Sequence, residues 1–234
     1  MRPGFFLALE GLDGAGKSTL AQNLKTALTA RLGHEPLILK EPTKGPYGRL
    51  IREMAKGGRP LQLSPADELD LFLRDRAYDV QENLAPALAA GQTVVMDRYV
   101  LSNVAYQGAL GLDPALILAK NEKFPWPDAT LIVEVSPALG LARVESGRGE
   151  NGRGESPDLA FETLGYLEKV QAIYDGLGLF GLKGLYRLDG QLPTAQLAQE
   201  AMRILNPLIA AIAAEPESLK PCSPTPPSSP TRRL

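Results

Sequence analysis

Short, uniformly apolar runs alternate along the chain with segments in which apolar residues recur every three or four positions. The uniform runs have the length and composition of strands buried on both faces. They cover 5–9, 37–39, 93–97, 129–135 and 185–188. The intervening helical spacing predicts helices over 18–32, 48–56, 64–84, 102–107, 114–123, 137–146, 159–177 and 194–213. Strands that alternate with helices predict an α/β fold with a five-stranded parallel sheet covered by helices on both faces.

The pattern ends near residue 214. From 215 to 234 proline and serine dominate, and few apolar residues remain. Such a segment cannot bury enough surface to offset the entropy of ordering it, so we expect a disordered tail. The expected organisation is one domain over 1–214 followed by this tail.

A glycine-rich segment directly follows the first predicted strand and precedes the first predicted helix. It fits the phosphate-loop pattern G-x-x-x-x-G-K-S/T at every fixed position. Glycines let backbone N–H groups converge on phosphate oxygens, Lys17 can reach the β- and γ-phosphates, and Ser18 can bind Mg²⁺. The fold is therefore expected to be a three-layer α/β/α architecture of the P-loop NTPase type. The expected ATP-binding residues are Gly11, Leu12, Asp13, Gly14, Ala15, Gly16, Lys17, Ser18 and Thr19.

The phosphate loop alone leaves kinases, GTPases and nucleotide switches open. A GTPase would normally add an Asn-Lys-x-Asp motif that reads the base. The nearest approach, 121–124, reads Asn-Glu-Lys-Phe and lacks the aspartate, which disfavours a GTPase.

Two further groups of residues favour phosphoryl transfer over hydrolysis. Asp97 and Arg98 end the third strand, where ligands bind in open parallel sheets. Asp97 can hold Mg²⁺ through water, and Arg98 can bind an acceptor phosphate, although a simple ion pair is an alternative. The glycine-rich segment at about 147–157 contains Arg148 and Arg153, so we expect a mobile lid that closes over the triphosphate. A plain solvated loop would have the same composition.

The overall composition narrows the chemistry further. The chain has 25 Lys and Arg against 27 Asp and Glu, which argues against a general nucleic-acid binder. One His and one Cys make a catalytic triad, a disulfide or a multi-histidine metal site improbable. No apolar run reaches the length of a membrane span, so we expect a cytoplasmic enzyme. An acceptor that is itself a phosphate would need no general base.

At this point the chain resembles the bacterial thymidylate kinase family, of the type with lid arginines. The matching segments are 10–19, 40–43, 68–76, 97–108 and 127–137. The resemblance implies a Mg²⁺-dependent nucleoside monophosphate kinase that transfers the γ-phosphoryl group of ATP to dTMP, giving dTDP and ADP for dTTP synthesis. It also implies a homodimer.

The resemblance assigns the thymidine site residue by residue. Phe72 would stack on the thymine ring, Arg76 would hydrogen-bond the base, and Asn103 would face it. Tyr106 would close off the sugar 2′ position, and Gln107 is a weaker contact. The alternative for each is a packing, surface or salt-bridge residue of its helix.

The resemblance also implies catalytic roles. Asp13 would approach the 3′-hydroxyl or the metal shell, and Arg98 would hold the dTMP phosphate. The expected catalytic set is Lys17, Asp13, Arg98, Arg148 and Arg153, with Ser18 and Asp97 toward the metal.

The sequence departs from the family at a few places. Gly14 replaces an arginine that some members carry in the phosphate loop, which shifts the expected catalytic arginine to the lid. The segment 44–47 is divergent, and Gln171 stands where arginine is frequent. Another (deoxy)nucleoside monophosphate kinase, or a catalytically silent ATP-binding regulatory module, therefore remain alternatives.

Overall fold

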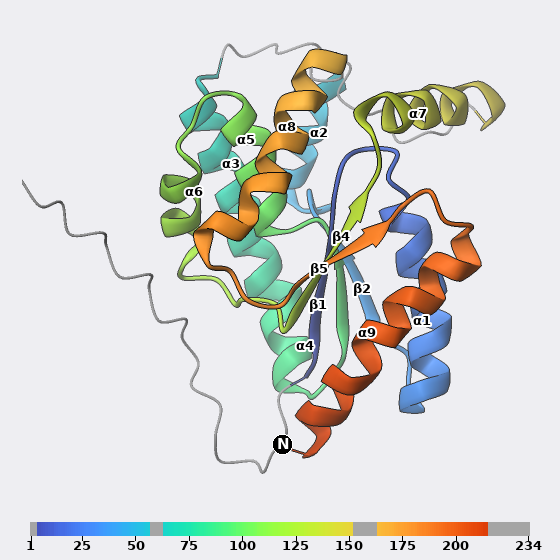
Figure 1. Ribbon diagram of the computed structural model, residues 1–234. Helices are drawn as coiled ribbons and strands as arrows, with labels where there is room; N and C mark the ends of the chain where they lie inside the picture. The colour runs from blue at the N-terminus through green and yellow to red at the C-terminus, as the bar shows by residue number, and fades with distance from the viewer. Residues whose placement is uncertain (1–3, 57–62, 152–162, 215–234) are drawn as a thin grey trace, which may run out of the picture.

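The computed structural model describes residues 4–56, 63–151 and 163–214. Its strands form one five-stranded parallel sheet in the order β2-β3-β1-β4-β5 (Figure 1). The strands are β1 (Phe6–Glu10), β2 (Leu37–Lys40), β3 (Val94–Asp97), β4 (Ala129–Glu134) and β5 (Leu185–Asp189). The three central strands are almost wholly buried, as their uniform hydrophobicity predicts. The predicted parallel sheet is confirmed.

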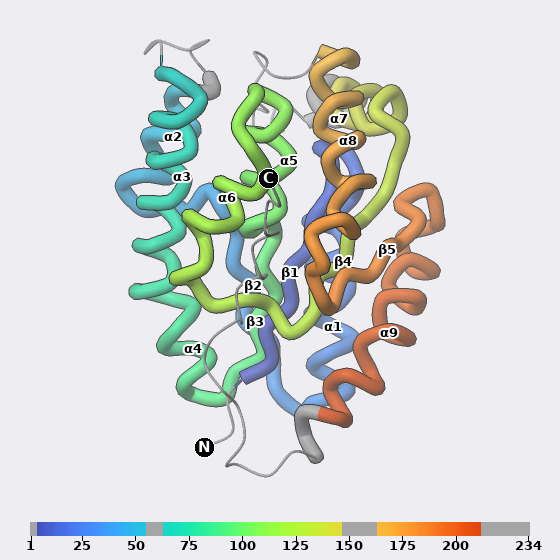
Figure 2. The backbone as a smooth tube through the Cα atoms, turned by 60° about the vertical axis from the view of Figure 1, so that its left-hand side comes forward, coloured from blue at the N-terminus to red at the C-terminus, as the bar shows by residue number. Residues whose placement is uncertain are grey.

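Helices cover both faces of the sheet, so the predicted three-layer architecture is also confirmed (Figure 2). On one face α1 (Lys17–Leu32) packs against α9 (Thr194–Ala214). On the other face α5 packs against α8, α6 and α3, and α2 packs against α3. Their bounds are α2 (Pro46–Lys56), α3 (Pro65–Asp79), α5 (Val100–Ala109), α6 (Pro114–Asn121) and α8 (Leu164–Gly176).

The long helix predicted from residue 64 forms with a change of geometry near its end. The Ser64 side chain accepts the N–H of Asp67, and Pro65 occupies the first position, so α3 begins where the capping pattern predicts. After Asp79 the chain continues as a π-helical turn (Val80–Leu84) and then as α4 (Ala85–Ala89). The outcome is one nearly continuous helical segment that carries the predicted thymidine-site residues of 68–76.

The end of α7 differs from the prediction. The helix expected over 137–146 extends to Asn151, so α7 (Pro137–Asn151) includes the first residues of the expected lid, Arg148 among them. A glycine inside a helix costs about 1 kcal/mol. This cost destabilises a helix that has already formed but does not end it at a fixed residue. Arg153, the rest of the lid and the tail over 215–234 lie outside the described residues.

The remaining predicted elements are present within a few residues of their expected bounds. A 3₁₀ turn (Leu177–Phe180) follows α8, and the predicted start of that helix at 159 falls outside the described residues. Among the residues described, no helix is both long and apolar enough to cross a membrane.

Candidate active site

The phosphate loop joins β1 to α1 at the carboxyl edge of the sheet. Gly11 has φ +133°, and a Cβ there would lie 2.3 Å from the Val133 carbonyl oxygen. Gly14 has φ +75°, and its added Cβ would lie 2.1 Å from the Gly140 carbonyl oxygen. Both positions therefore require glycine. The first turn of α1 contains no acidic residue, so its N–H groups and dipole can attract an anion.

Lys17 lies buried beneath this loop. Its Nζ donates hydrogen bonds to the carbonyl oxygens of Gly11 at 3.0 Å and Leu12 at 2.6 Å. Burial first, and then the nearby positive charge of Arg98, lower the pKa of Lys17 to about 8 against the opposing effect of Asp13. The ammonium group is thus desolvated before ATP binds, next to the position that the triphosphate would take.

Ser18 and Asp97 meet at the ends of α1 and β3. The Ser18 hydroxyl donates to Asp97 Oδ2 at 2.5 Å, and Lys40 Nζ lies 3.8 Å from the same oxygen. Asp97 Oδ1 is buried and has no hydrogen-bond partner among the described residues. Nowhere in the described ranges do three His, Cys, Asp or Glu side chains gather to hold a metal. A hydroxyl, a carboxylate and added phosphate and water oxygens suit Mg²⁺, so these residues fit that ion.

Arg98 lies beside the phosphate loop at the junction of β3 and α5. Its backbone is left-handed, with φ 72°, which is uncommon for a residue other than glycine. Its Nη2 donates to Asp13 Oδ1 at 2.5 Å and to the Tyr106 hydroxyl at 3.3 Å, and Tyr106 donates to Asp13 Oδ2 at 3.1 Å. The structure therefore brings the candidate site residues Asp13, Arg98 and Tyr106 together.

Asp13 is held in its ionised form. Burial acts to raise the pKa of its carboxyl, but the charges of Arg98 and Lys17 outweigh burial and lower the pKa to about 2. Asp13 is therefore an anion throughout the physiological range, which suits it to orienting Arg98 and not to exchanging protons.

The sequence did not single out Glu10, which supports Arg98. Its Oε1 accepts the backbone N–H of Tyr99 at 3.0 Å. Its Oε2 accepts the hydroxyls of Ser102 at 2.5 Å and Tyr174 at 3.2 Å. Ser102 Oγ in turn accepts Arg98 Nη1 at 3.1 Å. The available signal was an acidic residue at the end of an otherwise apolar buried strand.

Arg143 on α7 is a second residue that sequence reasoning missed. Its Nη1 donates to the Gly190 carbonyl oxygen at 2.9 Å and lies 3.4 Å from that of Gly14. These contacts tie α7, and with it the beginning of the expected lid, to the phosphate loop. No pattern in the sequence distinguishes Arg143 from a surface arginine.

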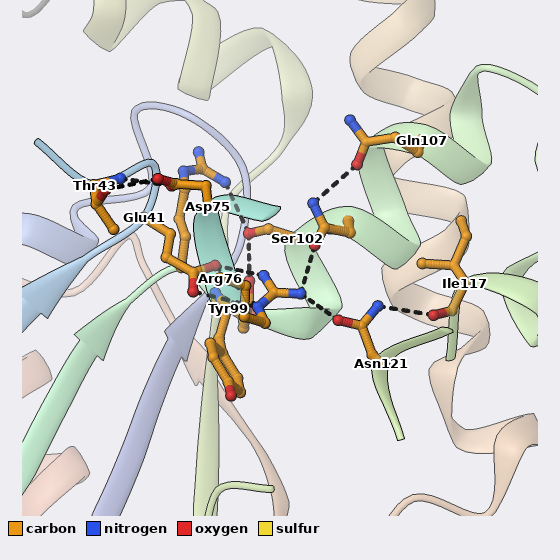
Figure 3. A network of polar contacts seen from close by, with 12 residues as sticks. Glu41, Thr43, Asp75, Arg76, Tyr99, Ser102, Gln107, Ile117 and Asn121 are labelled. Atoms are coloured by element: carbon orange, nitrogen blue, oxygen red, sulfur yellow. Dashed lines mark hydrogen bonds and ion pairs between the residues drawn. The ribbon is translucent and has the colours of Figure 1, made fainter. Parts of the chain in front are cut away.

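A second polar group, centred on Arg76, lies between α3, α5 and α6 (Figure 3). The guanidinium is 1% exposed and pairs with Glu41, at 2.5 Å from Nη2 to Oε2 and 3.1 Å from Nε to the same oxygen. Its Nη1 donates to Asn103 Oδ1 at 2.7 Å and to Asn121 Oδ1 at 2.5 Å. Burial raises the pKa of Glu41 to about 7, against the opposing charge of Arg76.

The remaining predicted thymidine-site residues lie near this group. Asn103 donates to Gln107 Oε1 at 3.1 Å, and Gln107 donates to Glu68 Oε1 at 2.9 Å, so both amides are buried within a polar chain. Phe72 is half-buried and, among the described residues, lies outside the main apolar cluster, whereas Leu69 and Leu73 of the same helix belong to it. That placement leaves the Phe72 ring available for stacking.

The loop after β2 is anchored to α3. Asp75 accepts the backbone N–H of Thr43 at 2.7 Å and its hydroxyl at 2.6 Å. This contact holds the loop that carries Glu41 against the helix that carries Arg76. The two halves of the Arg76–Glu41 pair are thereby fixed relative to each other.

A loop for a triphosphate and an arginine-lined site beside it face the same edge of a parallel sheet. That arrangement defines the class, a P-loop phosphotransferase with a phosphorylated acceptor. The sequence profile described as thymidylate kinase matches residues 9–201, and the chain belongs to the thymidylate kinase family. Members of this family phosphorylate dTMP to dTDP with ATP.

Individual relatives agree with the family profile. A thymidylate kinase of Xanthomonas campestris pv. campestris (strain B100) is 46% identical over 178 residues, which cover 76% of this chain and 74% of that protein. One of Xanthomonas euvesicatoria pv. vesicatoria (strain 85-10) is 44% identical over 178 residues, with the same coverage of 76% and 74%. One of Xylella fastidiosa (strain M12) is 42% identical over 176 residues, covering 75% and 76%.

Proposed function

We propose that this chain transfers the γ-phosphoryl group of ATP to dTMP, with Mg²⁺, to give dTDP and ADP for dTTP synthesis. The observation that carries the proposal is the position of Arg98. Its guanidinium is bound to Asp13 of the phosphate loop at 2.5 Å and lies 3.4 Å from the Gly11 carbonyl oxygen. A phosphate held by Arg98 is thus brought beside the phosphates held by the loop.

The transfer step needs positioning and charge neutralisation rather than a base. An anionic oxygen of the dTMP phosphate forms a bond to the γ-phosphorus, and the bond from that phosphorus to the β-phosphate oxygen breaks, so ADP leaves. The loop N–H groups and Lys17 would hold the β- and γ-phosphates in line with the acceptor. Mg²⁺, held by Ser18 and Asp97, would supply neutralising charge on the phosphates.

On the acceptor side, the geometry supports the roles expected for the thymidine site. Phe72 would stack on the base, Arg76 and Asn103 would contact its edge, and Tyr106 would lie against the sugar while it orients Arg98. Gln107 is buried behind Asn103 and would act by holding that amide.

We propose that the lid arginines neutralise the negative charge that develops on the phosphoryl group in the transition state. The phosphate loop cannot supply an arginine at Gly14, because any side chain there would meet the Gly140 carbonyl oxygen. Arg148 and Arg153 are the residues proposed to supply this positive charge, which can accelerate phosphoryl transfer by about 10³–10⁵.

The family membership also supports two finer proposals, a homodimer and a cytoplasmic location. Analytical ultracentrifugation of the full chain tests the first directly: a species near twice the monomer mass supports it, and a monomer over the working concentration range contradicts it.

The substrate assignment is tested with a coupled assay of ADP release on the full chain, using dTMP, dUMP, UMP, dCMP and dGMP as acceptors. The expected result is the highest kcat/KM for dTMP. Equal rates across the acceptors would indicate a broader nucleoside monophosphate kinase. ATP binding without ADP release on any acceptor would indicate a silent regulatory module.

A further inference from the structure

A buried amide at the end of α6 contacts the residue proposed to read the base. Asn121 is 0% exposed. Its Oδ1 accepts a hydrogen bond from Arg76 Nη1 at 2.5 Å, and its Nδ2 donates to the Ile117 carbonyl oxygen at 2.8 Å (Figure 3). Because Nδ2 is committed to a carbonyl acceptor, the oxygen must be the atom that faces Arg76.

The hydrogen bonds of Arg76 leave one donor over. A guanidinium carries five N–H groups. Glu41 takes the Nε–H and one on Nη2, while Asn103 and Asn121 take the two on Nη1. Within the described part of the chain, the second N–H of Nη2 is the one without an acceptor. It is therefore the donor that a bound base could use.

Other contacts restrict the plane of the guanidinium. The Cζ atom of Arg76 lies 4.5 Å from the centroid of the Tyr99 ring and 6.0 Å from that of Phe124. Phe124 lies in the α6–β4 connection, just after Asn121 at the end of α6. Rotation of the guanidinium would break the hydrogen bond to Asn121, so this connection contributes to the orientation of the last donor.

We propose that Asn121 is a positioning residue for base recognition, which holds Arg76 so that its one remaining N–H meets an acceptor on the pyrimidine. The inference rests on the proposed dTMP site. Asn121 acts through Arg76, because its Oδ1 is engaged by Arg76 and its Nδ2 by the Ile117 carbonyl oxygen. An N–H donor matches the O4 acceptor of thymine or uracil and opposes the exocyclic amine of cytosine. Asn121 would thus help to set the preference for dTMP over dCMP.

The test compares two variants of the full chain. Asn121→Leu keeps the volume but removes the acceptor, and Asn121→Asp keeps an oxygen for Arg76. With the Leu variant, the ratio of kcat/KM for dTMP to that for dCMP should fall roughly tenfold, since one buried donor loses its partner. The KM for ATP should not change. The Asp variant should keep the ratio within about threefold of the parent.

Leu205→Ala is the matched control for lost stability. Leu205 is buried in α9, on the opposite face of the sheet, and its truncation leaves a cavity far from Arg76. It should lower Tm and leave the dTMP to dCMP ratio unchanged. A Leu variant at position 121 that lowers Tm but keeps the ratio overturns the inference, as does an equal loss for every acceptor and for ATP.

If Asn121→Leu does not fold, Asn121→Ala, which also removes the acceptor, takes its place: a fallen ratio supports the inference, and a ratio equal to that of the parent overturns it. Arg76→Ala separates the two levels of the argument. If the parent fails to phosphorylate dTMP, or Arg76→Ala leaves the ratio unchanged, the proposed thymidine site fails. If Arg76→Ala abolishes the preference while Asn121→Leu keeps it, only the role of Asn121 fails.

Discussion

At the scale of single residues, the phosphate loop depends on the absence of a Cβ atom at its glycines. Gly14 has a left-handed backbone conformation. A Cβ added there would meet the Gly140 carbonyl oxygen, a backbone atom that cannot move aside as a flexible side chain could. The absence of a side chain at this position is therefore built into the packing of the loop against α7. The catalytic arginine would have to come from elsewhere in the chain.

Gly14→Ala should lower kcat/KM for ATP at least tenfold, because the loop must shift to relieve a 2.1 Å contact and a strained φ. Steady-state kinetics with varied ATP checks this. Gly165→Ala is the matched control, because a Cβ at that position of α8 would meet nothing within 4 Å. Equal behaviour of the two variants would contradict the account of the loop.

Lys17 carries a prediction of pH dependence. Its pKa in the free protein is lowered to about 8, so the protonated form, which binds phosphate, is lost as the pH rises through 8. kcat/KM for ATP reports the free protein and should fall roughly tenfold per pH unit above that value. Lys17→Arg keeps its charge and should flatten this limb of the profile, whatever its absolute rate. A profile that stays level to pH 10 in the parent would refute the assignment.

At the scale of elements, the junction of β3 and α5 fixes the position of Arg98, the arginine proposed to bind the acceptor phosphate. The left-handed backbone of Arg98 persists because Glu10 accepts the next N–H, that of Tyr99, and the hydroxyl of Ser102. Strain of this kind costs about 1–3 kcal/mol and survives where its surroundings fix it. β1 therefore supplies both the start of the phosphate loop and the support of the acceptor site.

Glu10→Gln should raise the KM for dTMP several-fold and lower the free energy of unfolding by about 1–3 kcal/mol, because charged hydrogen bonds to Tyr99 and Ser102 are weakened. Kinetics with varied dTMP and thermal melts measure both effects. Glu134→Gln removes a surface ion pair with Arg187 and should change stability by less than about 1 kcal/mol. If Glu10→Gln changes the KM for dTMP and the free energy of unfolding as little as this control does, the β3–α5 junction does not depend on Glu10.

The helix α7 and the expected lid make another prediction at this scale. Arg148→Ala or Arg153→Ala should lower kcat by at least tenfold while changing the KM for ATP little, since a lid arginine acts on charge that develops during transfer. Arg203→Ala, an exposed arginine of α9, is the matched control and should have no effect. If both lid variants turn over normally, the lid role is wrong.

Most elements could be predicted from the sequence because their signals are local. Apolar runs identified the strands, and the Ser64-Pro65 cap identified the start of α3. The end of α7 could not be predicted, because glycines weaken a helix without a definite stopping position. The π-helical turn after Asp79 precedes Pro86, which cannot donate the i→i−4 hydrogen bond to Glu82, but a proline signals a local disruption of the helix and not which turn type results.

At the scale of the whole molecule, the phosphate loop was predictable from a contiguous motif, but the Arg76 group was not. Arg76 meets Glu41 from the β2 loop and Asn121 from the end of α6, 35 and 45 residues away in sequence. Only the packing of α3, α5 and α6 brings these side chains together. The resemblance placed Arg76 at the base, but its buried partners required the tertiary structure.

The same packing buries more acid than one arginine can neutralise, and Asp79 shows the consequence. Asp79 is 2% exposed, its Oδ2 lacks a partner among the described residues, and burial raises its pKa from 3.8 to about 6. The native state therefore holds this proton more tightly than the unfolded chain, so stability falls as the pH rises from about 4 to 6 and the penalty is complete above 6.

Asp79→Asn should remove this penalty and raise the free energy of unfolding by about 2 kcal/mol at pH 7.5, or Tm by roughly 5 °C, with a much smaller effect at pH 4. Thermal melts at both pH values measure the difference. Asp70→Asn is the control, because Asp70 is exposed on the same helix and pairs only with Arg74 in the described structure. A variant at Asp79 that destabilises the fold equally at both pH values would show that this carboxyl is needed for its contact with Asn83 rather than strained by burial.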